Sequence, residues 1–234
     1  MEGWLADLLS YNDNYSLIEC KGLGEWNIPT GAVSYVQYIS EGLIDIFIGK
    51  NESIENNTES FINKINAKAT ELKDKIISNN YTDKKVIAMD WQKDFLEYFG
   101  LNVTYTYGTP QGLSAPVQLE IIEVAGDPEI SVIVDNLQSG TDFGARVASE
   151  TGKTHVIFSN FPEAVPGTDT YLEMIDYNID QLVKGISTYE TSQGEIRDLK
   201  NQVGNLELQR NMFGIVSVIF LILAIIFYMM YKKK

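Results

Sequence analysis

The chain has 234 residues and a formal net charge of −14, which is enough sequence for one medium domain or two small lobes. Its 32 acidic residues against 18 basic ones argue against binding to nucleic acid or docking on anionic lipid. Cys20 is its one cysteine, so an internal disulfide is excluded.

The first eighty residues are predicted to be mainly helical. A helical opening is followed by a strand-like segment at residues 15–18 and a helix around residues 33–43. Apolar residues then recur at three- and four-residue spacing, which predicts one long helix over residues 54–77. The first fifty residues contain too little apolar material to form a core of their own.

Residues 82–187 alternate between short apolar runs and helical stretches. The runs cover residues 86–89, 103–107, 130–134 and 155–158, and a helix-like segment follows each of them. Continuous apolar strands connected by helices predict a parallel four-stranded sheet that is covered on both faces.

The C-terminal part is predicted to be a helical stalk followed by a membrane span. The stalk rests on the 3-4-3 spacing of Ile196, Leu199, Val203 and Leu206, which suits either a short coiled coil or a solvated continuation of the span. Residues 212–231 carry no charge, and a helix of that length reaches roughly 30 Å, the thickness of a hydrocarbon core.

The charges that flank the span predict its orientation. Lys232, Lys233 and Lys234 follow it directly, so the positive-inside bias puts the C-terminus in the cytoplasm and residues 1–211 outside the cell membrane. Without these three lysines, the outer part carries −17. Five glycosylation sequons favour the same side; they begin at Asn14, Asn51, Asn56, Asn80 and Asn102.

The N-terminus does not read as an export signal, since it has neither a basic region nor an apolar run. Two explanations are open. Either the true N-terminus precedes Met1, or the protein is tail-anchored and faces the cytoplasm. The first is favoured by a resemblance to a known family.

The order of motifs resembles the metal-binding solute-binding proteins of ABC importers, the zinc and manganese cluster. Five segments carry the likeness: Glu25-Trp-Asn-Ile-Pro, Val86-Ile-Ala-Met-Asp, Ala148-Ser-Glu-Thr-Gly-Lys, Phe158-Ser-Asn and Asp169-Thr-Tyr-Leu-Glu-Met-Ile-Asp-Tyr-Asn-Ile. The resemblance covers residues 1–187. It implies an α/β fold of two lobes joined by a long helix, with a parallel four-stranded C-terminal lobe.

The resemblance, together with the apolar and charged pattern of the C-terminal part, predicts a division of the chain. A partial N-terminal lobe (1–53) lacks the lobe's first strands, which would lie before Met1. The long connecting helix (54–80), the C-terminal βα lobe (81–188), the stalk (189–211), the transmembrane helix (212–231) and a cytoplasmic basic tail (232–234) follow. The partners implied are an ABC permease and the lipid bilayer, without nucleic acid.

The metal ligands that the resemblance implies fall on few metal-binding side chains. They are Gly24 or Glu25, then Asp90, then Asn160, whereas the family uses histidines and carboxylates. Such oxygen donors suit Mn²⁺, Ca²⁺ or Mg²⁺ better than Zn²⁺. Asp90 is equally well interpreted as a helix N-cap, and Asn160 as a turn residue. The single histidine, His155, is interpreted as a packed or surface residue.

Aromatic residues suggest that a ligand other than a metal could bind in a cleft between the two lobes. Trp26, Trp91, Tyr105 and Tyr107 are candidates to line it, although core packing is the more common role of such side chains.

Two functions are consistent with these patterns. The first is a membrane-anchored extracytoplasmic receptor that captures a divalent cation, as the transported ligand, between two lobes and delivers it to a permease. The second is a degenerate receptor-like ectodomain with an interaction or structural role and no metal. An enzyme is not predicted, since the chain has no glycine-rich phosphate loop, no Gly-x-Ser-x-Gly elbow and no Cys–His nucleophile pair.

Overall fold

A computed structural model describes residues 3–11, 15–20 and 25–232 of the chain. The chain divides into two compact units, Met1–Ser187 and Thr188–Lys234. The sequon at Asn14, the alternative ligand position Gly24, and Lys233 and Lys234 lie outside the described residues.

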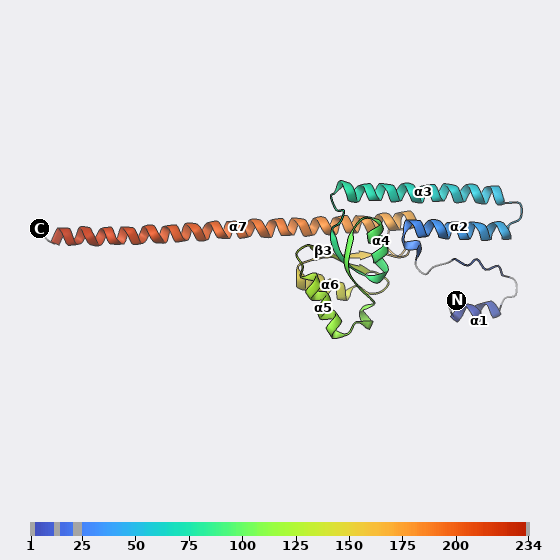
Figure 1. The fold of residues 1–234 in the computed structure, drawn as a ribbon, viewed down its shortest axis with the longest axis horizontal. Helices are drawn as coiled ribbons and strands as arrows, with labels where there is room; N and C mark the ends of the chain where they lie inside the picture. The colour runs from blue at the N-terminus through green and yellow to red at the C-terminus, as the bar shows by residue number, and fades with distance from the viewer. Residues whose placement is uncertain (1–2, 12–14, 21–24, 233–234) are drawn as a thin grey trace. The chain divides into compact units, whose positions relative to one another are not determined.

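The first part of the chain is helical. Figure 1 shows α2 and α3 side by side. The helices expected over residues 33–43 and 54–77 are confirmed, and the second is unbroken. The strand expected at residues 15–18 is wrong: these residues form no regular element, because an isolated extended segment has no neighbouring strand to pair with. The elements are α1 (Gly3–Ser10), η1 (Glu25–Asn27), α2 (Pro29–Ile46) and α3 (Asn51–Ser78).

The end of α3 is set by Asn80, which adopts a left-handed conformation with φ of 58°. Two backbone bonds close the turn there: Tyr81 N–H donates to the Ile76 carbonyl at 3.0 Å, and Asn80 N–H donates to the Ile77 carbonyl at 2.9 Å. Asparagine tolerates this conformation better than most residues, so this is a Schellman-type stop. It turns the chain from α3 into the sheet and buries Tyr81 in the core.

Four strands form one sheet in the order β2-β1-β3-β4, and every neighbouring pair is parallel. This confirms the sheet expected from the four apolar runs. All seven residues of β3 are buried, as expected of a central strand that is covered on both faces. The strands are β1 (Lys85–Met89), β2 (Asn102–Tyr107), β3 (Ile130–Asn136) and β4 (Thr154–Phe158).

Helices follow each strand, as the sequence pattern predicts. Between the strands lie η2 (Asp90–Gln92), α4 (Lys93–Tyr98), η3 (Pro110–Gly112), α5 (Ala115–Ala125) and α6 (Asp142–Thr151). The last helix, α7 (Tyr171–Lys232), contributes residues to both units. It begins with a capping box, in which Glu173 N–H donates to Thr170 Oγ1 at 3.3 Å and Thr170 N–H donates to Glu173 Oε2 at 2.8 Å.

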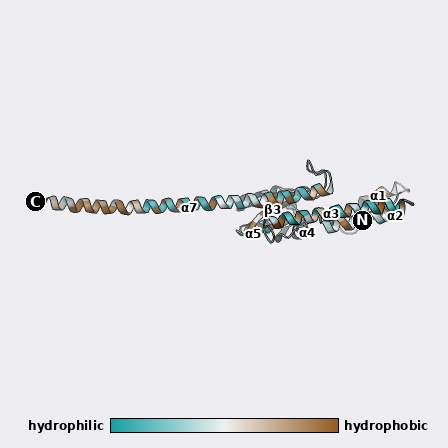
Figure 2. Cartoon of the chain, turned by 90° about the horizontal axis from the view of Figure 1, so that it is seen from above, coloured by the Kyte–Doolittle hydropathy of each residue, from teal (hydrophilic) through white to brown (hydrophobic). Residues whose placement is uncertain are grey.

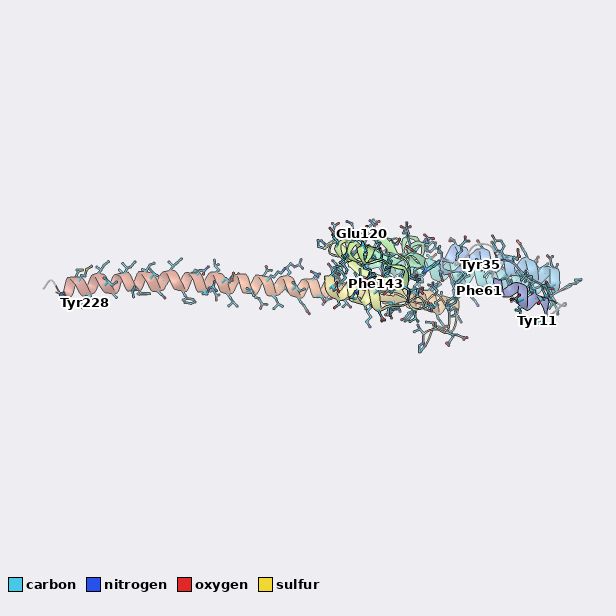
Figure 3. All side chains as sticks on the ribbon, turned by 90° about the horizontal axis from the view of Figure 1, so that it is seen from below. Tyr11, Tyr35, Phe61, Glu120, Phe143 and Tyr228 are labelled. Atoms are coloured by element: carbon cyan, nitrogen blue, oxygen red, sulfur yellow. The ribbon has the colours of Figure 1, made fainter. Side chains whose placement is uncertain are left out.

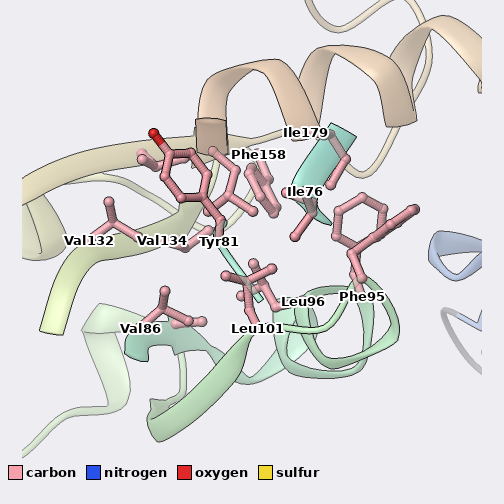
Figure 4. Packing of buried hydrophobic residues seen from close by; sticks show 14 of the residues in the cluster. Ile76, Tyr81, Val86, Phe95, Leu96, Leu101, Val132, Val134, Phe158 and Ile179 are labelled. Carbon is pink, nitrogen blue, oxygen red and sulfur yellow. The ribbon is translucent and has the colours of Figure 1, made fainter. Parts of the chain in front are cut away.

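The two faces of the sheet bury separate apolar clusters. Alternate residues of a strand point to opposite faces, so Val86 and Ala88 join one cluster, and Ile87 and Met89 join the other. The first cluster packs the sheet against α3, α4 and the first turns of α7, with Phe158 fully buried in it (Figure 4). The second packs the sheet against α5 and α6. This is a three-layer α/β unit.

The second unit is the remainder of α7. Its described side chains are exposed along the whole helix beyond residue 190, and Figure 3 shows them projecting from it. The apolar residues gather toward its C-terminal end (Figure 2). Among the described residues, α7 is the one helix that is long and apolar enough to cross a membrane, and its most apolar window is not buried within the protein.

Candidate functional site

The loops that follow β1, β3 and β4 meet at Asn160, at the carboxyl edge of the sheet. The Asn160 side-chain oxygen Oδ1 accepts a hydrogen bond from Gln92 Nε2 at 2.8 Å. Its backbone N–H donates to Gln138 Oε1 at 3.1 Å, and its backbone oxygen accepts from Trp26 Nε1 at 3.3 Å. Open α/β sheets bind ligands at this edge. Four segments far apart in sequence therefore converge on one residue.

A second layer of hydrogen bonds holds this loop against α7. Ser159 N–H donates to Asn178 Oδ1, and Asn178 Nδ2 donates back to the Ser159 carbonyl, both at 2.9 Å. Gln138 Nε2 donates to Ser159 Oγ at 3.2 Å. Ser159 and Asn178 are almost completely buried, and Ser159 directly precedes Asn160. These bonds therefore fix the backbone position of Asn160.

The residues proposed as ligands from the sequence lie in or next to this convergence. Glu25 begins η1 directly before Trp26, and Asp90 begins η2 two residues before Gln92; both are exposed. The interpretation of Asp90 as an N-cap is wrong, because Met89 occupies that position and Asp90 is the first residue of the turn. Only Asn160 is held by the hydrogen bonds described above.

The donor set is poor in metal-binding groups. Within residues 3–11, 15–20 and 25–232, no group of three or more His, Cys, Asp or Glu side chains is arranged to hold a metal ion. The polar atoms that do meet are mainly amide oxygens and nitrogens, with the Trp26 indole N–H and the Ser159 hydroxyl beside them. Amide and carboxylate oxygens suit hard cations, and amides also suit neutral polar molecules.

Aromatic side chains border the amide cluster, which is formed by Gln92, Gln138 and Asn160. The Trp26 ring packs edge-on against Tyr35, with centroids 5.8 Å apart, and lies 6.2 Å from Phe161, which is half-exposed. Burial, followed by the charges near it on Cys20 and Glu25, raises the pKa of Tyr35. Trp91 is half-exposed, whereas Tyr107 is buried in the core. Of the four aromatic candidates, Trp26 alone bonds to Asn160.

The histidine belongs to a different cluster, on the face of the sheet that α5 and α6 cover. His155 Nε2 lies 2.8 Å from Asp135 Oδ2, and the Tyr107 hydroxyl donates to Asp135 Oδ1 at 2.5 Å. Asp135 is completely buried. Burial and then the negative charge of Asp135 raise the pKa of Tyr107 far above its usual range.

Sequence reasoning did not single out Gln92, Gln138 or Asn178. A positional signal was present for two of them, since Gln92 and Gln138 follow the ends of β1 and β3 by two or three residues. Asn178 lies within a helix and belongs to the segment of residues 169–179 that carries the family resemblance, but its helical position does not indicate that it contacts the loop at Ser159.

A family model described as zinc-uptake complex component A, periplasmic (ZnuA), matches residues 25–185. The chain belongs to the ZnuA family. This confirms the family inferred from the order of motifs, whose members are transport binding proteins and not enzymes.

Solved structures support the same fold. A crystal structure of ZnuA superposes with a TM-score of 0.65 at 16% identity, covering 78% of this chain and 74% of that one. A periplasmic metal-binding protein from Candidatus Liberibacter asiaticus, in its cadmium-bound form, gives 0.59 at 18% identity, over 70% of this chain and 63% of that one. A metal-free mutant of the same protein gives 0.60 at 18% identity, and the chain spans 62% of its length. No curated protein matches the sequence.

Proposed function

We propose that this ZnuA-family chain is a membrane-anchored receptor that captures a divalent cation outside the cell and delivers it to an ABC permease. The proposal rests on two features. The family match covers residues 25–185, which include the segments that meet at Asn160. Beyond them, α7 has an apolar segment, and α7 is the one helix of the described residues that is long and apolar enough to cross a membrane.

The anchor is supported by the chemistry of the last part of α7. Residues 212–231 contain no charged side chain and are followed by Lys232, Lys233 and Lys234. Hydrocarbon cannot hydrogen-bond a peptide group, so a helix is the form in which a single segment crosses it. Under the positive-inside bias, this arrangement puts the ZnuA-like domain outside the cytoplasm.

The convergence on Asn160 is the observation that carries the proposed cation site. The Asn160 Oδ1 oxygen has a second lone pair besides the one that accepts from Gln92. Asp90 begins the same short turn that contains Gln92, so its exposed carboxylate is available to a solvated cation. Glu25 precedes Trp26, which bonds to the Asn160 carbonyl. We propose Asp90 as the principal ligand, with Asn160 and Glu25 contributing oxygens.

The proposed donors set the order of metal preference. Imidazole and thiolate are the ligands that give Zn²⁺ its high affinity, whereas carboxylate and amide oxygens suit Mn²⁺, Ca²⁺ and Mg²⁺. We therefore expect Mn²⁺ or Ca²⁺ to bind more tightly than Zn²⁺, and the Zn²⁺ dissociation constant to exceed about 1 µM.

A second candidate is a receptor-like envelope protein that binds no metal. It is favoured by the satisfied state of the site, because Asn160 already uses its N–H, its backbone oxygen and its Oδ1 in bonds within the protein. The described residues also lack a cluster of three acidic, histidine or cysteine side chains. In this case the amide cluster would hold the loops together and nothing else.

Calorimetry on the full chain in nonionic detergent distinguishes the two. Mn²⁺, Ca²⁺ and Zn²⁺ are titrated into wild type, Asp90→Ala and Asp94→Ala. Asp94 is the matched control, since it is exposed, lies four residues away and loses the same charge. If the chain is a cation receptor, we expect Asp90→Ala to raise the dissociation constant of the bound cation at least about tenfold and Asp94→Ala to leave it unchanged. Submicromolar Zn²⁺ binding that is insensitive to Asp90→Ala would refute the site, and absence of all binding would favour the second candidate.

The anchor has a test of its own. Protease added to intact cells of the source organism should remove the domain formed by residues 1–187. Digestion only after lysis would reverse the proposed topology, whatever the outcome of calorimetry.

A further inference from the structure

The helix of the second unit carries an apolar strip that nothing in that unit covers. Ile196, Leu199, Val203 and Leu206 are exposed by 44%, 59%, 56% and 63%. Their 3-4-3 spacing puts them on one side of the helix, because residues three and four apart are surface neighbours. Exposure of four large aliphatic side chains in one line is costly in water, so this strip is expected to be covered by a partner.

The order of residue types in the strip specifies the kind of partner. In a heptad labelled a to g, Ile196 and Val203 occupy position a, and Leu199 and Leu206 occupy position d. β-Branched residues at a with leucine at d favour two parallel helices over three or four. The pattern therefore matches a copy of itself in the same direction.

Charges beside the strip agree with this direction. In a parallel pair, position g of one helix faces the next position e of the other. Here these positions are Glu195 and Lys200, which carry opposite charges. Two-fold symmetry repeats the contact on the other side, so a dimer gains two attractive pairs and no repulsive one from these residues.

We propose that residues 195–206 of the stalk are a homodimerisation element that pairs two copies of this chain as a short parallel coiled coil. The parallel direction rests on the proposed anchor, because two chains held in one membrane by C-terminal helices run the same way. Confinement to a membrane also raises the effective concentration of one stalk around another, which compensates for a strip of fewer than two full heptads. In the same phase, position a after Val203 falls on Arg210, so the charge of that side chain ends the apolar strip before the membrane segment.

Cysteine cross-linking of the full chain in proteoliposomes tests the geometry. Leu206 and Leu208 form a matched pair, since both are leucines and are exposed by 63% and 62%. They lie about 200° apart around the helix, so one is on the proposed seam and the other on its far side. In a Cys20→Ser background, we expect Leu206→Cys to oxidise to a covalent dimer, and Leu208→Cys to yield at least about fivefold less.

Charge and packing variants test the energetics in detergent, with light scattering as the readout of mass. Leu206→Glu should raise the dimer dissociation constant at least about tenfold, whereas Leu208→Glu should leave it unchanged. Glu195→Lys and Lys200→Glu should each weaken the dimer, and the double variant should restore it.

Several outcomes would overturn the proposal. They are equal cross-linking at positions 206 and 208, a monomer at every concentration in both detergent and liposomes, or a dimer that Leu206→Glu leaves intact. The last result would assign association to the apolar segment alone. Protease accessibility in cells reports on the anchor separately, so a wrong topology and a wrong dimer are distinguishable.

Discussion

The bond between Tyr107 and Asp135 offers a sharp test of how the sheet is stabilised. Tyr107→Phe removes the hydroxyl that donates to Asp135 Oδ1 at 2.5 Å. The ring remains, and with it the edge-on contact to Phe143 at 5.4 Å between centroids. The substitution therefore isolates one hydrogen bond between strands β2 and β3 without opening a cavity.

The magnitude follows from burial. Asp135 is completely buried and Tyr107 is 3% exposed, so no water replaces the lost donor. A hydrogen bond to a charged group contributes about 1.5–3 kcal/mol. Asp135 keeps His155 on its other oxygen at 2.8 Å, which limits the loss. We expect about 2 kcal/mol of destabilisation, which corresponds to a fall of about 4–8 °C in Tm for a domain of this size.

Thermal unfolding of the full chain in nonionic detergent measures this shift. The tryptophans all lie in the first unit, so their fluorescence reports its unfolding. Tyr105→Phe is the matched control, because Tyr105 is on the same strand but its hydroxyl bonds to Glu120 near the surface. Its Tm should change by less than about 2 °C. Equal shifts in the two variants would refute the role assigned to the buried bond.

The remaining predictions concern pH and packing. Above pH ~10, unfolded tyrosine ionises while Tyr107 keeps its proton, since burial and then the charge of Asp135 raise its pKa in the fold. The part of the free energy of unfolding that depends on the Tyr107 proton is therefore fully present below this pH and decreases above it. Urea titrations should show wild type losing about 1.4 kcal/mol per pH unit more than Tyr107→Phe, and parallel profiles would contradict this. Gly185→Ala should cost about 1–3 kcal/mol in the same assay, because its Cβ would lie 2.3 Å from Val156 Cγ2. A Cβ added at Gly194 would have no atom within 4 Å, so Gly194→Ala should leave the free energy of unfolding of the first unit unchanged. Equal effects of the two substitutions would be inconsistent with close packing at Gly185. Phe158→Ala, by chemical denaturation, should cost about 3–5 kcal/mol, and a loss below about 1 kcal/mol would show that Phe158 is not central to the core.

Local patterns in the sequence were sufficient to predict most of the helices and strands. The apolar runs became β1 to β4, and the spacing of Ile65, Ala69, Leu72 and Ile76 became the buried side of α3. These features depend on neighbours within a few residues, so the sequence displays them directly. The apolar segment of residues 212–231 is of the same kind, because length and hydropathy alone make it a candidate span.

Tertiary structure alone decided the site. The sequence predicted Asn160 as a ligand, but its partners Gln92 and Trp26 lie 68 and 134 residues away, and no local pattern pairs either of them with Asn160. The same holds for residues 15–18, whose alternation suits a strand that has no strand beside it. A hydrogen bond or a sheet ladder needs two partners, and where the second is distant in sequence, only the folded chain brings it within reach.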